Sequence, residues 1–237
     1  MSTGFAGFPA GTLKFFRDLK RNNKREWFQP RKEVFEQVVK QPMTELVMAL
    51  NTQMIKFAPE YVADPKKTIF RIYRDTRFSA DKTPYKTHLG AWFPRRGLAV
   101  PGAGLYFGIS ATGVETGGGI YHPPPETMRA VRTHIAENHL RLRAILTQAK
   151  VKKLFGGLEG GELTRIPKGF DASHPAAELI RKTDWLLGAT LTPPVVTGPQ
   201  LYKKLVEQFR TMVPFIEFLN QPLGRIKPAR DLLEVHF

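Results

Sequence analysis

The first third of the chain shows the three- and four-residue spacing of hydrophobic residues that is typical of amphipathic helices. One stripe, within residues 13–19, follows Thr12, which we interpret as a helix N-cap. It stops at Asn22, and asparagine tolerates the left-handed conformation that ends many helices. Two further helical runs begin near Pro30 and Pro42, since proline suits the first turn of a helix.

The middle of the chain is richer in β-branched and aromatic residues, which indicate strands. The segments with this composition are residues 68–73, 87–93, 104–110, 113–121 and 185–191, and "GELTRIP" is a shorter candidate. The run "PPP" should begin another helix, with a break near Asn138. The amphipathic stretch "TGPQLYKKLVEQFRTMVPFIEFL" predicts a long helix that Pro214 kinks or ends.

Helices come first, strands follow in the middle and helices return, so the elements are segregated rather than alternating. This order predicts an α+β fold with a mostly antiparallel central sheet of about five or six strands, packed with N-terminal, middle and C-terminal helices. The chain contains no internal repeat, and we expect residues 1–237 to form a single domain.

Charge changes the picture more than overall composition does. Lys and Arg number 36 against 21 Asp and Glu, which gives a net charge of +15 and an isoelectric point near 10.1. Such a balance favours an anionic small molecule, nucleic acid or another acidic surface as a partner. The longest apolar runs are far shorter than the roughly 18 residues that a membrane span needs, so we expect a cytoplasmic protein without membrane partners.

The usual signatures of chemistry are missing from the sequence. The chain has no cysteine, which excludes disulfides and thiolate catalysis, and it contains no zinc motif, phosphate-binding loop or serine nucleophile motif. We therefore predict no metal and no cofactor. One unusual feature is the run Gly117, Gly118 and Gly119 within a strand pattern, which indicates a bulge or the close approach of another backbone or a ligand.

The stretch "RIYRDTRFSADKTPYKTHLG" (residues 71–90) is the strongest candidate for a binding site. Its residues 71–86 hold five basic and two acidic side chains, a net charge of +3. An arginine between aromatic residues on a strand should be partly buried and therefore needs a partner, either an aspartate or an anionic ligand. A second basic and aromatic cluster, "KRNNKREWFQPRK", places Trp27 and Arg31 at a turn between helices, where side chains can converge.

These blocks also carry a family resemblance. "NNKREWF", "RIYRDTRFSADKTPYK", the glycines before "IYHPPP" and "PKGFDASHP" resemble the uncharacterised family catalogued as domain of unknown function 2461, over most of the chain. The resemblance implies a stand-alone domain found in soluble bacterial and fungal proteins and supplies no catalytic role. It groups Asn23, Phe78 and Pro84 with the basic residues as one constellation.

We predict a pocket for an anionic small molecule that bears phosphate or carboxylate, because arginine offers forked donors to such groups and lysine adds a point charge. Asp75 and Tyr85 are candidates for proton transfer if a reaction takes place. Nucleic acid binding and a purely structural network of Arg and Asp are the alternatives. The predicted ligand-binding residues are Trp27, Arg31, Arg71, Arg74, Arg77, Lys82, Tyr85 and Lys86.

Overall fold

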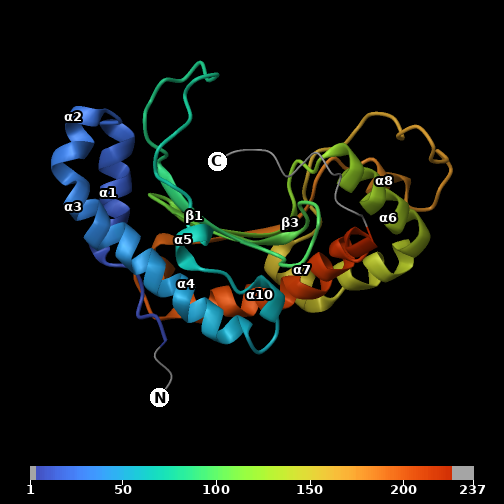
Figure 1. Cartoon of the computed structure of the whole chain (residues 1–237). Helices are drawn as coiled ribbons and strands as arrows, with labels where there is room; N and C mark the ends of the chain where they lie inside the picture. The colour runs from blue at the N-terminus through green and yellow to red at the C-terminus, as the bar shows by residue number, and fades with distance from the viewer. Residues whose placement is uncertain (1–3, 226–237) are drawn as a thin grey trace. The chain divides into compact units, whose positions relative to one another are not determined.

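A four-stranded antiparallel sheet with the order β1-β2-β3-β4 organises the chain. The computed structural model describes residues 4–225, without the Arg225 side chain, and Figure 1 labels its helices and strands. The strands are β1 (His88–Pro94), β2 (Gly104–Ser110), β3 (Gly113–Ile120) and β4 (Trp185–Leu191).

Helical segments precede the strands, separate β3 from β4 and follow β4. The N-terminal segments are α1 (Ala10–Arg21), α2 (Arg25–Phe28), the 3-10 segment η1 (Gln29–Arg31), α3 (Lys32–Phe35), the π-helical segment η2 (Glu36–Lys40), α4 (Gln41–Met54), η3 (Pro59–Tyr61) and α5 (Pro65–Thr68). The later ones are α6 (Pro125–Leu146), α7 (Ala149–Phe155), α8 (Ala177–Ile180), α9 (Pro193–Val196), α10 (Gln200–Asn220) and η4 (Leu223–Arg225). The class is therefore α+β, as predicted.

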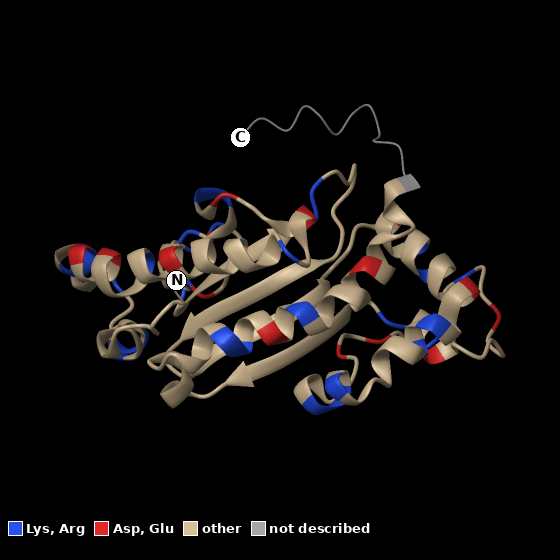
Figure 2. Ribbon diagram, turned by 90° about the horizontal axis from the view of Figure 1, so that it is seen from below, with Lys and Arg blue, Asp and Glu red and all other residues tan. Residues whose placement is uncertain are grey.

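The described chain divides into two compact units. Unit 1 contains residues 4–93, 105–117 and 189–210, and unit 2 contains residues 94–104, 118–188 and 211–225. In unit 1, alternate residues of β1 and β2 point into a core where Phe93, Phe107 and Phe209 of α10 pack ring to ring, with centroids 5.6–6.5 Å apart. The opposite face of these strands, which we call the polar face, carries His88, Tyr106 and Ser110. Figure 2 shows the charged residues on the exposed side of α10.

The helical run of residues 25–54 changes its hydrogen-bonding pattern because of Pro42. Proline has no N–H, so Pro42 cannot donate to the carbonyl of Val38 four residues earlier. That carbonyl instead accepts a hydrogen bond from the buried hydroxyl of Thr12, and the π-helical segment η2 lies directly before α4. The prediction that Thr12 caps α1 is therefore wrong: Pro9 occupies the N-cap position, and Thr12 ties α1 to η2.

The prediction of five or six strands is also wrong. Residues 68–73 form only isolated bridges, Ile69 with Ala91 and Tyr73 with Tyr85, because the segment changes its partner along its length and no continuous ladder develops. "GELTRIP" likewise makes only an isolated bridge, between Glu162 and Lys182.

Helix ends were predicted with mixed success. α1 ends at Asn22, as its sequence indicates, and α6 has a non-helical residue at Asn138 (φ −128°) where a break was predicted. Pro214 lies inside α10, so of the two predicted outcomes, a kink or an end, the end is excluded. Proline has no N–H, so the helix continues past Pro214 without a hydrogen bond from that residue to the carbonyl four residues earlier.

Candidate functional site

The basic stretch of residues 71–86 forms an antiparallel, two-limbed projection of unit 1, which we call the arm (Figure 1). Its limbs are joined by the Arg74 N–H donating to the Pro84 carbonyl at 2.9 Å and the Lys86 N–H donating to the Ile72 carbonyl at 2.8 Å. Phe78, at the tip, is 95% exposed. The arm therefore holds its charged residues on a hydrogen-bonded backbone of fixed register.

Most of the arm's cations are bound to partners within the arm. The Arg74 guanidinium donates to the carboxylate of Asp81, while Arg77 binds Asp75 through two nitrogens, at 2.8 and 3.1 Å. Lys82 Nζ donates to the Thr76 carbonyl at 2.9 Å. Hydrogen bonds from Arg77 lower the pKa of Asp75 to about 2, and those from Arg74 and then Thr83 lower the pKa of Asp81 to about 2. Two of the arm's three arginines thus have carboxylate partners.

Tyr85 belongs to the core of unit 1 rather than to an open site. Its ring is 1% exposed and stacks on Phe28 with centroids 4.1 Å apart. The Asn23 amide donates to the Tyr85 carbonyl at 2.8 Å and accepts from the Tyr85 N–H at 3.1 Å. Burial, followed by the neighbouring Tyr73, raises the pKa of Tyr85. A buried, protonated phenol of this kind is suited to packing.

Lys86, Trp27 and Arg31 form local contacts with aromatic rings. Lys86 Nζ lies 5.3 Å from the Phe70 ring centroid, and burial, followed by the charge of Arg71, lowers the pKa of Lys86. Arg31 donates to the Trp27 carbonyl at 3.0 Å and places its guanidinium 4.8 Å from the Trp27 ring centroid. Such cation–π pairs hold the charged groups along aromatic surfaces.

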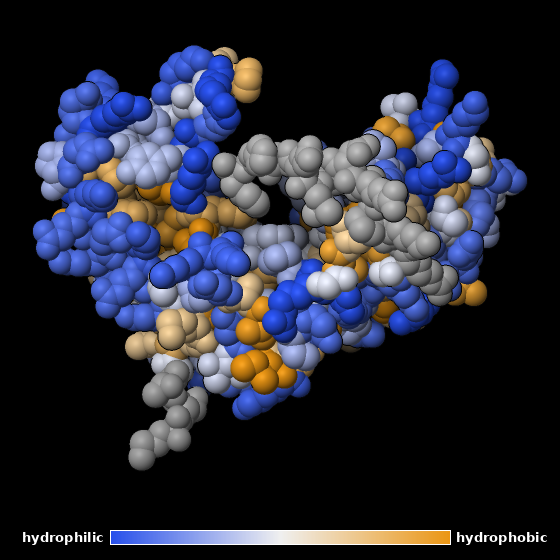
Figure 3. Space-filling model, viewed as in Figure 1, coloured by the Kyte–Doolittle hydropathy of each residue, from blue (hydrophilic) through white to orange (hydrophobic). Residues whose placement is uncertain are grey.

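A groove of about 650 Å³ lies beside the base of the arm, within unit 1. Its walls are largely apolar, and a rim of charged side chains surrounds them. Figure 3 shows hydrophobic surface bordered by hydrophilic residues near the N-terminal helices. The groove is lined by Phe28, Lys32, Phe35, Glu36, Lys40, Thr44, Pro65, Lys66, Ile69, Phe70, Arg71, Ile72, Tyr73 and Leu89. Of the predicted ligand-binding residues, Arg71 is the one that lines this groove.

The charges of the groove rim are partly paired. Lys40 and Glu36, four residues apart, form an ion pair at 3.0 Å. Within residues 4–225, the side chains of Lys32, Lys66 and Arg71 make no hydrogen bond or ion pair. The groove therefore combines an apolar interior with three cations that are available to a ligand.

The glycine run packs against protein groups. A β-carbon on Gly119, which has φ +144°, would lie 1.9 Å from the Trp185 carbonyl oxygen of β4, and one on Gly118 would lie 2.8 Å from Met212 Sδ. The strand and the helix thus approach these glycines more closely than any side chain would permit. The close approach that the sequence predicts is made by neighbouring parts of unit 2.

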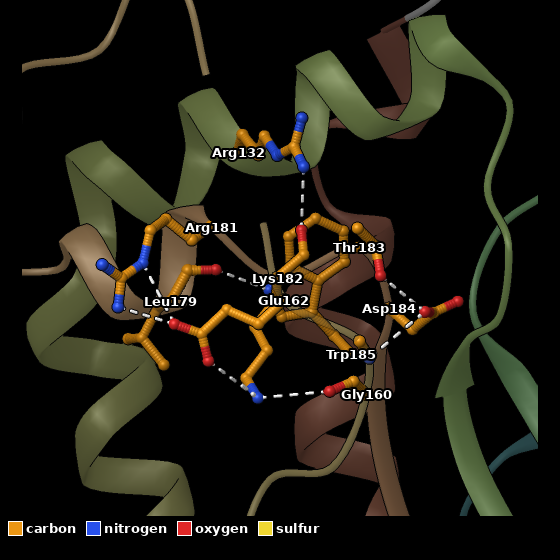
Figure 4. Close-up of polar contacts among 10 residues, drawn as sticks. Arg132, Gly160, Glu162, Leu179, Arg181, Lys182, Thr183, Asp184 and Trp185 are labelled. Carbon is orange, nitrogen blue, oxygen red and sulfur yellow. Dashed lines mark hydrogen bonds and ion pairs between the residues drawn. The ribbon is translucent and has the colours of Figure 1, made fainter. Parts of the chain in front are cut away.

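Unit 2 contains a buried polar cluster that the sequence did not indicate (Figure 4). The Asp184 carboxylate, 6% exposed, accepts from the His122 N–H at 2.6 Å and lies 3.2 Å from His122 Nδ1. Burial alone would raise the pKa of Asp184, but hydrogen bonds from His122, Thr183 and Gly161 together lower it. His122 has a φ of +46°, a rare conformation for a residue with a side chain. The Asp184 contacts hold the chain in this conformation.

Arg132 is the second charged member of this cluster. It is 8% exposed, donates to the Lys182 carbonyl at 2.9 Å, and burial lowers its pKa. Nearby, Arg181 binds Glu162 at 2.6 Å (Figure 4). In the sequence, the "GGGIYHPPP" motif draws attention to His122. Its partner Asp184 lies 62 residues later, and no spacing rule connects the two.

The described residues also bear on metals and membranes. Among residues 4–225 no group of three or more His, Asp or Glu side chains is placed to hold a metal ion. No helix in this part of the chain has the length and apolar character required to cross a bilayer.

The fold and the site together define an α+β protein with a four-stranded antiparallel sheet, an ion-paired basic arm and a cation-rimmed groove. The chain belongs to the family described as "Conserved hypothetical protein (DUF2461)", whose model matches residues 11–218. This match confirms the resemblance carried by the arm motif. No curated protein and no solved structure matches the chain.

Proposed function

We propose that the protein binds an amphiphilic anion in the groove of unit 1, with a phosphate or carboxylate head at Arg71 and an apolar portion along the groove walls. The observation that carries this proposal is the combination of an apolar interior with three cations that have no partner among residues 4–225. It retains the anionic ligand predicted from the sequence but moves the site from the arm to its base.

The charge arrangement favours an anion at the rim. The Glu36 carboxylate is neutralised by Lys40, so Lys32, Lys66 and Arg71 leave the rim with a net positive charge. The Arg71 guanidinium donates no hydrogen bond within the described part of the chain and can hold phosphate or carboxylate through two parallel hydrogen bonds. Arg74 and Arg77 are already occupied by aspartates.

The walls favour a ligand with a hydrocarbon portion. Phe28, Phe35, Ile72 and Leu89 are buried residues whose side chains border the groove, while Phe70 remains 43% exposed. Burying apolar surface contributes about 25 cal/mol per Å², which a fully polar ligand would not gain here. The volume of about 650 Å³ lies within the roughly 300–1,000 Å³ typical of sites for organic ligands.

The test measures binding of dodecyl phosphate, below its micelle concentration, by isothermal titration calorimetry. Inorganic phosphate supplies the head without the tail, and dodecanol supplies the tail without the charge. We expect dodecyl phosphate to bind more tightly than either, and laurate to behave like dodecyl phosphate. Equal binding of dodecanol would remove the role of the cations, and equal binding of inorganic phosphate would remove the role of the apolar walls.

A pair of variants locates the site. Arg71→Ala removes a charge-assisted contact worth about 1.5–3 kcal/mol and should weaken dodecyl phosphate roughly tenfold to a hundredfold. Arg17→Ala removes an exposed arginine of α1 that does not line the groove and serves as the control. If the two variants bind dodecyl phosphate equally well, Arg71 does not bind the head group and the proposal fails.

A further inference from the structure

A second recess of unit 1, which we call the sheet pocket, lies on the polar face of β1–β3. Its volume is about 230 Å³, below the range of about 300–1,000 Å³ usual for drug-sized ligands, so it suits a small molecule. It is separate from the groove, since the two have no lining residue in common. The lining residues are Lys20, Thr87, His88, Tyr106, Gly108, Ser110, Ala111, Thr112 and Glu115.

Two glycines position Tyr106 in this pocket. A β-carbon on Gly108 would lie 2.2 Å from the Tyr106 hydroxyl oxygen, and one on Gly90 would lie 2.7 Å from the Tyr106 ring. The hydroxyl end of the Tyr106 ring therefore occupies the space that a side chain at position 108 of β2 or at position 90 of β1 would fill. Only glycine at both places lets the phenol lie against the sheet, beside His88 and Glu115.

Four titratable side chains line the sheet pocket, and three of them, Lys20, His88 and Glu115, are exposed. Among the described residues, the side chains of Lys20, His88, Tyr106 and Glu115 make no hydrogen bond or ion pair. By contrast, the Ser110 and Thr112 hydroxyls are 2.9 Å apart and hydrogen-bond each other. A pocket that gathers several unpaired polar groups while its turn residues are satisfied has the character of a ligand site.

The charges on the pocket wall are opposite in sign and do not meet. Lys20 comes from the last turn of α1, and Glu115 comes from β3. Both border the same small space without forming an ion pair. An ammonium and a carboxylate that line one recess without pairing with each other are complementary to a molecule that carries a carboxylate and an ammonium of its own.

The neutral groups add a donor and an acceptor. Burial, and then the charge of Glu115, raise the pKa of Tyr106, so its hydroxyl stays protonated and can donate. Burial and the charge of Lys86 lower the pKa of His88, against the opposing effect of Glu115, so an uncharged imidazole with one accepting nitrogen is favoured.

We propose that the sheet pocket binds a small zwitterion of the amino-acid class, with its ammonium group at Glu115 and its carboxylate at Lys20. Tyr106 donates to the ligand carboxylate or side chain, and His88 accepts from the ammonium group. The pocket thus gives the protein a second ligand class, distinct from the amphiphilic anion of the groove.

The experiment uses the full chain and saturation-transfer NMR with the common L-amino acids at millimolar concentration. Acetate and methylammonium supply each charge alone. We expect at least one amino acid to bind, and to bind more tightly than both single-charge probes. If no amino acid gives a transfer signal, or if acetate alone binds as tightly as the best amino acid, the proposal is wrong.

Variants then assign the two ends of the ligand. Glu115→Gln and Lys20→Met should each weaken the best amino acid about tenfold or more, because Gln keeps an acceptor but loses the negative charge, and Met loses both the charge and the donors. The controls are Glu60→Gln and Lys24→Met, exposed residues that do not line the pocket. Effects equal to those of the controls would overturn the assignment.

Discussion

The substitution Asn23→Ala should destabilise unit 1 by releasing the arm from the turn between α1 and α2. The Asn23 amide makes two hydrogen bonds with the backbone of Tyr85, at 2.8 and 3.1 Å. Each such bond contributes about 0.5–1.5 kcal/mol, and the Tyr85 carbonyl and N–H would lose their partners next to a buried ring. We therefore expect the free energy of unfolding to fall by about 2 kcal/mol.

Calorimetry and local hydrogen exchange both measure this effect. For a chain of this size, about 2 kcal/mol corresponds to a decrease in Tm of roughly 4–8 °C. The amide of Tyr85 should also exchange faster, because its acceptor has been removed. Asn23→Asp keeps the acceptor and loses the donor, so its effect should be intermediate.

The neighbouring Asn22 is the matched control. Its amide makes one exposed hydrogen bond, to the Asp18 carbonyl at 2.9 Å, so Asn22→Ala should cost only a few tenths of a kcal/mol to about 1 kcal/mol. If Asn23→Ala and Asn22→Ala give the same Tm, or if Tyr85 exchange is unchanged in Asn23→Ala, the two contacts do not secure the arm.

Two further predictions concern the arm and the sheet. The Asp81 carboxyl, titrated by NMR, should show a pKa of about 2, and this pKa should return toward its ordinary value in Arg74→Ala. Because the pKa of Asp81 is lower in the folded state, the ion pair should stabilise the arm above about pH 4. That stabilisation should be lost as the pH falls through about 2. An unshifted Asp81 in the unchanged protein would contradict the pairing. Gly119→Ala should lower Tm by several degrees, since its β-carbon would overlap the Trp185 carbonyl, whereas Gly157→Ala, with open space around it, should not. Equal Tm values would show that β4 can shift to accommodate the added methyl group without loss of stability, which would contradict this prediction.

The sequence predicted those elements whose signal is local. β2 and β4 have the predicted bounds, and Asn22 and Asn138 mark the predicted interruptions, because alternation and backbone preference are properties of a few neighbouring residues. Residues 68–73 have strand composition but change partners along their length, and composition does not determine which backbone lies alongside.

In the candidate site, too, the sequence predicts what depends on neighbouring residues and misses what depends on distant ones. The composition of the arm indicates that its arginines need partners, and the two aspartates of the stretch, Asp75 and Asp81, supply two of them. Which arginine binds which aspartate depends on the register of the arm's limbs, which is fixed only when the Arg74 N–H meets the Pro84 carbonyl. The groove and the sheet pocket were missed because each gathers residues from segments far apart in the sequence, with no spacing rule to connect them.

The order of the strands has a consequence for how the chain reaches its folded state. β1, β2 and β3 are neighbours both in the sheet and in the sequence, whereas residues 121–184 intervene before β4 adds beside β3. Closing a long loop costs more entropy than closing a hairpin, so the three consecutive strands can pair early and β4 joins later. During synthesis β3 is therefore an edge strand until β4 emerges, and the inserted segment must not block that edge.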